Sequence, residues 1–212
     1  MIPLPHRTLI ATMGFDERHV LPALRLMPYD RLVVVAGPET FRSGGFRRLK
    51  GLEPSLRPVP VRAFDLLDSL ATVRRTILDS AAKGPVRLSV AGGTKILTSA
   101  AILAAFLEGV EAWYCAPEPI RLPVLHGLRL TEVFSPSERT MVGLIRGPVS
   151  IERLVSTAGL RGMSRRTALA AIRSLVAKGL LEIEVRSGRS FVRPSDRFAL
   201  FRPHVAAPPR KA

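Results

Sequence analysis

The 212-residue sequence has a single cysteine, Cys115, which excludes an internal disulfide and any zinc site built from several thiolates. Its four histidines lack the spacing of metal ligands, so we expect no bound metal. Long apolar runs are also missing, because the longest, residues 96–107, is shorter than the ~18 residues that cross a bilayer. The first six residues lack the basic flank and apolar stretch of a signal peptide. We therefore expect a cytoplasmic protein without membrane contact.

Acidic residues are scarce relative to basic ones. The chain has 17 acidic and 32 basic residues, for a formal net charge of +15, and 27 of the basic residues are arginines. Residues 135–212 carry 15 basic and 5 acidic residues, net +10, whereas residues 1–134 carry 17 and 12, net +5. A solvated basic surface is one explanation. The concentration of charge in the shorter segment favours the other, which is a polyanionic partner such as nucleic acid.

Residues 1–134 alternate short β runs with amphipathic helices. The continuous apolar run at residues 32–35 is typical of a strand buried in a parallel sheet. This alternation predicts an α/β domain with a doubly wound, Rossmann-like sheet. We expect strands at residues 8–13, 31–36, 59–61, 86–91, 112–116 and 121–125, and helices at residues 16–27, 64–82 and 94–108, with a loop at 37–51 that runs into a further helix.

A second domain is expected to begin at Ser135. Ser135, Pro136 and Glu138 combine an N-cap, a proline in the first turn and a capping-box glutamate. Further caps at Ser150 and Ser164 predict two more short helices. Residues 181–186 alternate as a half-buried strand and are followed by a tight turn and a return strand. We therefore predict a small α+β winged helix-turn-helix at residues 135–202 and a disordered tail at 203–212.

A helix-turn-helix places its second helix in the major groove, with the N-terminal residues of that helix at the base edges. Here the corresponding helix opens with two adjacent arginines, and two more flank the turn of the predicted hairpin. The candidate contacts to double-stranded DNA are Ser164, Arg165, Arg166, Thr167, Arg173, Arg186 and Arg189. The alternative is a winged helix that contacts protein and whose arginines only raise solubility.

The sharpest local pattern in the first domain is Gly92, Gly93, Thr94 and Lys95, directly after a predicted strand. The glycines permit a tight turn, and Thr94 can cap the next helix. Free amides at a helix N-terminus attract anions, whereas a lysine there is unfavourable by ~0.3–1 kcal/mol unless an anion joins it. The glycine spacing is not that of a Walker loop. An ordinary turn with Lys95 in water fits the spacing equally well.

Residues 92–95 (Gly-Gly-Thr-Lys), with residues 14–17 (Gly-Phe-Asp-Glu) after the first strand, resemble the CRISPR-associated Rossmann-fold (CARF) domain. With the winged helix, residues 7–195 resemble the archaeal CARF transcription regulators of CRISPR loci. The resemblance implies a homodimer whose glycine loops meet in one pocket, and a cyclic oligoadenylate, here cyclic tetra-adenylate, as effector with no cofactor. The ligand residues it implies are Thr12, Met13, Gly14, Phe15, Gly92, Gly93, Thr94 and Lys95. Asp16 is left out because a carboxylate repels phosphate.

We expect a regulator and not an enzyme, with no catalytic residues. Some CARF proteins cleave their ligand, but no histidine or carboxylate pair stands out near the predicted pocket as a general base. Arg121 and His126 match the spacing of a ribonuclease motif, yet they lie in a proline-containing β run. The leading hypothesis is a ligand-responsive regulator of CRISPR-associated genes. The alternatives are a ring nuclease that uses the same pocket, a sensor of another nucleotide, and a nucleic-acid-binding module whose pocket holds no ligand.

Overall fold

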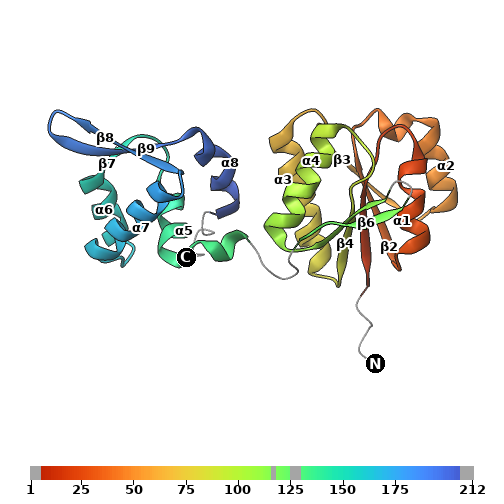
Figure 1. Ribbon diagram of the computed structural model, residues 1–212, viewed down its shortest axis with the longest axis horizontal. Coiled ribbons are helices and arrows are strands. Elements are labelled where there is room, and N and C mark those ends of the chain that lie inside the picture. The colour runs from red at the N-terminus through yellow and green to blue at the C-terminus, as the bar shows by residue number, and fades with distance from the viewer. Residues whose placement is uncertain (1–5, 116–117, 125–129, 206–212) are drawn as a thin grey trace, which may run out of the picture. The chain divides into compact units, whose positions relative to one another are not determined.

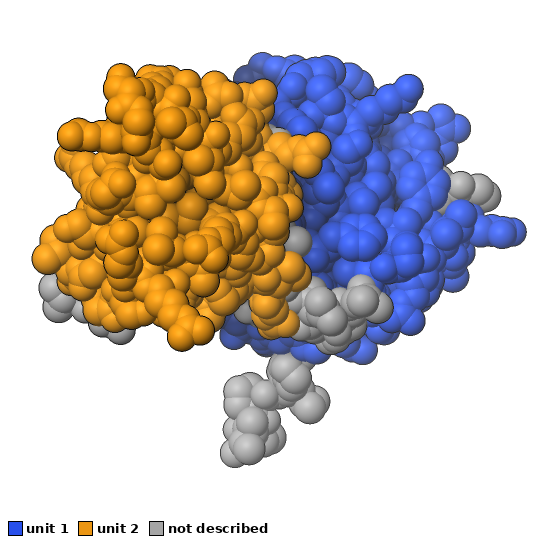
Figure 2. Space-filling view, turned by 60° about the vertical axis from the view of Figure 1, so that its left-hand side comes forward, with its two compact units in different colours: residues 1–130 blue, residues 131–212 orange. Residues whose placement is uncertain are grey.

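The computed structural model describes residues 6–115, 118–124 and 130–205. The chain forms two compact units, Met1–Leu130 and Thr131–Ala212, which Figure 1 shows as ribbons and Figure 2 in separate colours. Within the described ranges, none of the helices is long and apolar enough to cross a membrane.

A six-stranded sheet forms the centre of the first unit, in the order β3-β2-β1-β4-β5-β6. The strands are β1 (Thr8–Thr12), β2 (Arg31–Ala36), β3 (Arg57–Pro60), β4 (Val86–Ser89), β5 (Glu111–Cys115) and β6 (Pro119–Arg121). Neighbours from β3 to β5 pair in parallel, and β6 is an antiparallel edge. This is the strand order of a Rossmann-like sheet. The strand expected at 121–125 shares only Arg121 with the observed strand β6, which begins at Pro119. Residue 125 lies outside the described residues.

Helices cover both faces of this sheet (Figure 1). They are α1 (Leu21–Leu26), α2 (Gly44–Leu52), α3 (Leu66–Ala81) and α4 (Lys95–Glu108). Alternate residues of a strand point to opposite faces of the sheet and belong to two separate hydrophobic cores. Ile10 and Val33 pack with α3 and α4 on one face, whereas Leu9 and Leu32 pack with α1 and α2 on the other. Because β1 and β2 are covered on both faces, their sequences are continuously apolar. Cys115 is buried in the second of these cores, as expected of a core residue.

Two expected segments of the first unit can be given their observed bounds. The helix expected from Asp16 to Met27, with Pro22 kinking or shortening it, is divided into a 3-10 turn, η1 (Glu17–His19), and α1, because Pro22 is accommodated in a first helical turn and not in a helix interior. The stretch at 37–51, expected to be a loop that runs into a helix, contains the 3-10 turn η2 (Thr40–Arg42) and most of α2, which begins at Gly44. The Ser43 hydroxyl accepts the backbone N–H of Phe46 and so caps this helix.

The second unit combines short helices with a three-stranded antiparallel sheet, β7-β9-β8. Its elements are η3 (Leu130–Val133), α5 (Pro136–Leu144), β7 (Val149–Ser150), α6 (Ile151–Gly159), α7 (Arg165–Ala177), β8 (Leu181–Arg186), β9 (Arg189–Pro194) and α8 (Asp196–Val205). The hydroxyls of Ser135, Ser150 and Ser164 cap α5, α6 and α7, each accepting the backbone N–H three residues on. The helix starts predicted from these serines are confirmed.

Helix α8 corrects the expected boundary of the C-terminal tail. It extends through residues 203–205, where we expected disorder to begin. Phe198 and Val205 are almost fully buried, and this apolar contact holds the helix on the unit. Residues 206–212 lie outside the described residues.

Candidate functional site

A cavity of about 900 Å³ lies at the carboxyl ends of the parallel strands in the first unit. It is lined by residues 13–16 after β1, 37–40 after β2, 61–65 after β3 and 91–94 after β4, together with His19. Open α/β sheets bind ligands at this edge, and the volume is in the range of small-molecule sites. The cavity is therefore the first candidate for a functional site in this unit.

Most of the predicted ligand residues line this cavity. They are Met13, Gly14, Phe15, Gly92, Gly93 and Thr94. Thr12 does not: it is 1% exposed, and its hydroxyl lies 3.5 Å from the Ser89 carbonyl oxygen, to which it donates. Lys95 is exposed at the first position of α4 and is not part of the lining. It makes no ion pair with any residue that the structure describes.

The glycine loop is packed directly on the loop that follows β1. A Cβ at Gly92 would lie 2.7 Å from the Thr12 carbonyl oxygen, which is too close for any side chain, and Gly14 lies against the Gly93 nitrogen. Gly93 has a φ of +100°, which side chains rarely allow. Glycine at positions 92 and 93 thus permits two backbone segments to meet at the cavity wall.

Thr94 connects the glycine loop to α4 and to the loop after β3 through hydrogen bonds of its hydroxyl. Its hydroxyl accepts the Leu97 N–H, which caps α4, and donates to the Ala63 carbonyl at 2.5 Å. Thr98 donates to the Gly92 carbonyl at 3.2 Å. One capping hydroxyl satisfies only one of the orphan amides of a first helical turn, so the N-terminus of α4 keeps its preference for an anion.

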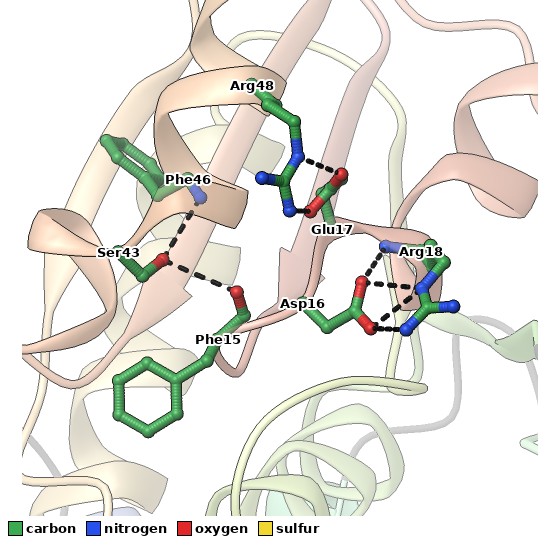
Figure 3. A network of polar contacts seen from close by, with 7 residues as sticks. All are labelled: Phe15, Asp16, Glu17, Arg18, Ser43, Phe46 and Arg48. Atoms are coloured by element: carbon green, nitrogen blue, oxygen red, sulfur yellow. Dashed lines mark hydrogen bonds and ion pairs between the residues drawn. The ribbon is translucent and has the colours of Figure 1, made fainter.

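The loop after β1 is held against α2 by polar contacts (Figure 3). Ser43 donates to the Phe15 carbonyl at 3.4 Å. Arg48 donates to both carboxylate oxygens of Glu17, at 2.6 and 2.8 Å. A Cβ at Gly45 would lie 2.2 Å from the Phe15 oxygen, so only glycine allows this approach. These contacts between the loop and α2 have no local signal in the sequence, because their partners are about 30 residues apart in the chain.

Two aspartates keep negative charge at the cavity. Hydrogen bonds from Arg18 lower the pKa of Asp16 to about 2. The pKa of Asp65 is also lowered, mainly because the backbone N–H of Asp68 donates to it. Both carboxylates are therefore ionised at neutral pH, and each is balanced by an arginine, Asp16 by Arg18 and Asp65 by Arg62.

The cavity lining also contains polar residues that sequence analysis did not select. Glu39 and His19 join the two aspartates, and Arg62 pairs with Asp65 at 3.3 Å. No histidine or carboxylate pair stands out in the sequence as a general base near the pocket, whereas the structure places a histidine and three carboxylates in the cavity lining. These residues follow different strands, and only the sheet order brings them together. Within the described residues, no group of three or more metal-ligating side chains is found. His126 lies outside the described residues.

In the second unit, the predicted DNA-contacting residues lie on the surface. Ser164, Arg165, Arg166 and Thr167 open α7, and all four are exposed, as is Arg173 further along. Arg186 and Arg189 flank the hairpin turn, whose Ser187 and Gly188 both have positive φ. Arg186 is paired with Glu184 at 2.8 Å. No ion pair involving Arg165, Arg166, Arg173 or Arg189 is present in the described parts of the chain.

Comparisons with known proteins give only distant matches. No protein-family model and no curated protein matches the sequence. Can2 from Sulfobacillus thermosulfidooxidans in complex with cyclic tetra-adenylate is 14% identical, with a TM-score of 0.48, 93% of this chain covered and 62% of that one. Enterococcus italicus Csm6, bound to cyclic hexa-2'-fluoro-hexa-dAMP, is 11% identical, with a TM-score of 0.43, 57% of this chain covered and 35% of that one.

A type III CRISPR defence DNA nuclease activated by cyclic oligoadenylate is 15% identical, with a TM-score of 0.49 and 99% of this chain covered, against 32% of that one. This chain thus spans less than two thirds of the length of each of these structures. All three TM-scores are below 0.5, so we draw no conclusion about fold or function from these similarities.

Proposed function

We propose that this chain is a ligand-responsive transcription regulator of CRISPR-associated genes. Its first unit is a CARF domain that binds a cyclic oligoadenylate, and its second unit is a winged helix-turn-helix that binds DNA. The observation that carries the proposal is the cavity wall, where Gly92 and Gly93 pack on Met13 and Gly14 at the N-terminus of α4. Backbone amides, a helix N-terminus and an unpaired Lys95 beside it suit a phosphodiester.

An exposed apolar stripe on α4 supports a homodimer. Ile96, Leu103 and Phe106 are 37%, 46% and 44% exposed, and their spacing places them on one face of this apolar helix. A second copy that covers the stripe about a two-fold axis would bring both Lys95 residues and both glycine loops together. A cyclic tetra-adenylate can share that two-fold symmetry, which suits one ligand per dimer.

The exposed arginines support DNA as the partner of the second unit. Arg165 and Arg166 open α7, the helix that would enter a major groove. Arg189 lies at the hairpin turn, where it can reach the backbone or a minor groove. The sequence beyond residue 134 carries a net +10, which favours a polyanion.

A titration of the chain's own upstream DNA, with and without cyclic tetra-adenylate, tests the regulator. The proposal predicts that ligand changes DNA affinity by about 5–150-fold, and that DNA changes ligand affinity by the same factor. Equal DNA affinity with and without bound ligand would contradict it. Scrambled DNA of the same length is the control for charge alone.

Ring-nuclease activity in the same pocket is the second candidate function. The observation that favours it is the presence of both His19 and Glu39 in the cavity lining, because imidazole and carboxylate side chains are common general acids and bases. Incubation with labelled cyclic tetra-adenylate distinguishes the two. A regulator leaves the ring intact over many hours, whereas linear product in excess of the protein would favour the nuclease.

A further inference from the structure

Two large aromatic side chains are left exposed at the rim of the cavity. Phe15 is 67% exposed and Phe64 is 81% exposed, and both line the cavity, whose other residues are glycines, small side chains, Met13 and several polar or charged groups. Neither ring contacts another aromatic ring in the described part of the chain. Exposed phenylalanine in a concave site is the usual signature of a surface that a ligand covers.

The two residues occupy the same local setting. Each is followed by an aspartate that caps the next helical turn: Asp16 caps η1 and Asp65 caps α3. A hydrogen bond also holds the backbone at each position. The Ser43 hydroxyl donates to the carbonyl of Phe15, and the Thr94 hydroxyl donates to the carbonyl of Ala63, which precedes Phe64. In Figure 3 the Phe15 ring points away from the polar contacts that hold its backbone. The backbone under each ring is thus fixed while the ring stays free.

The loops that carry the two rings both contact the glycine loop. The Phe15 loop packs on it through Gly14 and Gly93, and the Phe64 loop is joined to it by the hydrogen bond from Thr94 to the Ala63 carbonyl. Along the chain, Phe15 precedes α1 on one face of the sheet, and Phe64 precedes α3 on the other. An anion at the amides of the glycine loop would therefore lie next to both loops that carry the rings.

Charge divides the cavity in the same way. The carboxylates Asp16 and Asp65 directly follow the two rings, and each is already paired with an arginine, Arg18 or Arg62, so the positive charge beside the rings is committed to a protein carboxylate. The glycine loop and Lys95 favour a phosphate. If the phosphate of a nucleotide lies at the glycine loop, its uncharged bases are the parts that can occupy the positions beside Phe15 and Phe64.

We propose that Phe15 and Phe64 are stacking platforms for two bases of a nucleotide ligand whose linking phosphate lies at the glycine loop. The proposal rests on the proposed function for the phosphate position and adds the residues that hold the bases. Stacking on an aromatic ring contributes about 1–3 kcal/mol per base in nucleic-acid-binding proteins.

Alanine and tyrosine variants test the platforms by affinity. Phe15→Ala and Phe64→Ala should each weaken binding of cyclic tetra-adenylate about 5–150-fold, and Phe→Tyr at the same positions should restore it to within a few-fold. Leu52→Ala is the matched control, because Leu52 is 63% exposed and lies outside the cavity. Parent-like affinity in both alanine variants overturns the proposal.

A fluorescence measurement separates this proposal from the proposed function. In Phe64→Trp, a base stacked on the indole should quench its emission, with the parent's Trp113 as baseline. The probes are cyclic tetra-adenylate, adenosine monophosphate and ribose 5-phosphate, and quenching is expected from the first two only. If adenosine monophosphate quenches but cyclic tetra-adenylate does not bind the parent, the proposed function fails and the platforms stand. If no base-bearing probe quenches, or ribose 5-phosphate quenches equally, the platforms fail.

Discussion

At the scale of single residues, the site is built from close backbone approaches and fixed charges. Gly92 brings the loop after β4 onto the loop after β1, and the lining carboxylates Asp16 and Asp65 are held by Arg18 and Arg62. Lys95 lies beside the glycine loop and makes no ion pair with the residues that the structure describes. Gly92 is packed against the backbone, whereas Lys95 is exposed. Single substitutions at these two positions should therefore have separate effects on protein stability and on ligand affinity.

Lys95→Ala should lose affinity for cyclic tetra-adenylate and keep the parent's stability. Lys95 is exposed and unpaired in the described structure, so its removal leaves the core intact. A charge-assisted contact to phosphate contributes about 1.5–3 kcal/mol, which corresponds to a loss of about 10–150-fold. Calorimetric titration and thermal unfolding measure the two quantities. Parent-like affinity would show that the loop is an ordinary structural turn.

Gly92→Ala should lower the free energy of unfolding by about 1–3 kcal/mol, because its methyl group would lie 2.7 Å from the Thr12 carbonyl oxygen. Gly51→Ala is the control: nothing lies within 4 Å of its added Cβ, and it stands inside α2. That control should be neutral or more stable. Chemical denaturation of both variants makes the comparison, and equal stability of the two would contradict the packing of the loops.

At the scale of elements, capping serines and one buried ion pair organise the second unit. Glu138 is 5% exposed at its side chain, is paired with Lys178, the C-cap of α7, and accepts the backbone N–H of Ser135 at 2.6 Å. Burial raises the pKa of Glu138, but hydrogen bonds from Lys178, Ser174 and Ser135 outweigh this effect and lower it to about 2. This carboxylate therefore links the start of α5 to the end of α7.

Acid should destabilise the second unit through Glu138. A carboxylate whose pKa is lower in the folded state stabilises the fold above its ordinary pKa near 4.5, and that contribution disappears as pH falls toward 2. Glu138→Gln should lower the free energy of unfolding at pH 7 by about 1–3 kcal/mol and flatten the loss between pH 4.5 and 2. Glu152→Gln, at an exposed position in α6, is the control. Parallel pH profiles for parent and Glu138→Gln would refute this role.

The DNA contacts proposed for the second unit divide into groove contacts and backbone contacts. Arg165→Ala with Arg166→Ala should weaken DNA binding and relax sequence preference, because these residues open the helix expected at the base edges. Arg189→Ala should instead reduce the slope of log affinity against log salt by roughly 0.9. Arg25→Ala, on an exposed part of α1, should change neither. Identical binding curves for all variants would exclude DNA recognition by this unit.

Elements that carry a local signal could be predicted from the sequence. Serine caps fixed the starts of α5, α6 and α7, and apolar runs gave β1 and β2. Helix α8 and the two-residue β7 carry no such signal, because tertiary packing alone holds them. The same difference applies to the candidate site. The glycine loop is a local pattern that the sequence shows directly. Phe64, Glu39 and Arg62 line the same cavity only because the order of the strands brings their loops to one edge of the sheet.

At the scale of the whole molecule, the proposed function assigns ligand sensing to the first unit and DNA binding to the second, more basic unit. The proposed interface for a second copy is the exposed apolar stripe of α4, and Lys95 begins that same helix. A dimer would therefore complete the pocket and pair two DNA-facing units at once. Ligand binding and DNA binding would then be linked through the subunit interface.

The stoichiometry of binding tests this account most directly. Calorimetric titration of cyclic tetra-adenylate into the full chain should give one ligand per two chains, with the protein dimeric by light scattering. Leu103→Glu, in the apolar stripe, should yield a monomer that binds the ligand far more weakly. One ligand per chain, or undiminished binding by a monomeric Leu103→Glu, would contradict a pocket shared between subunits.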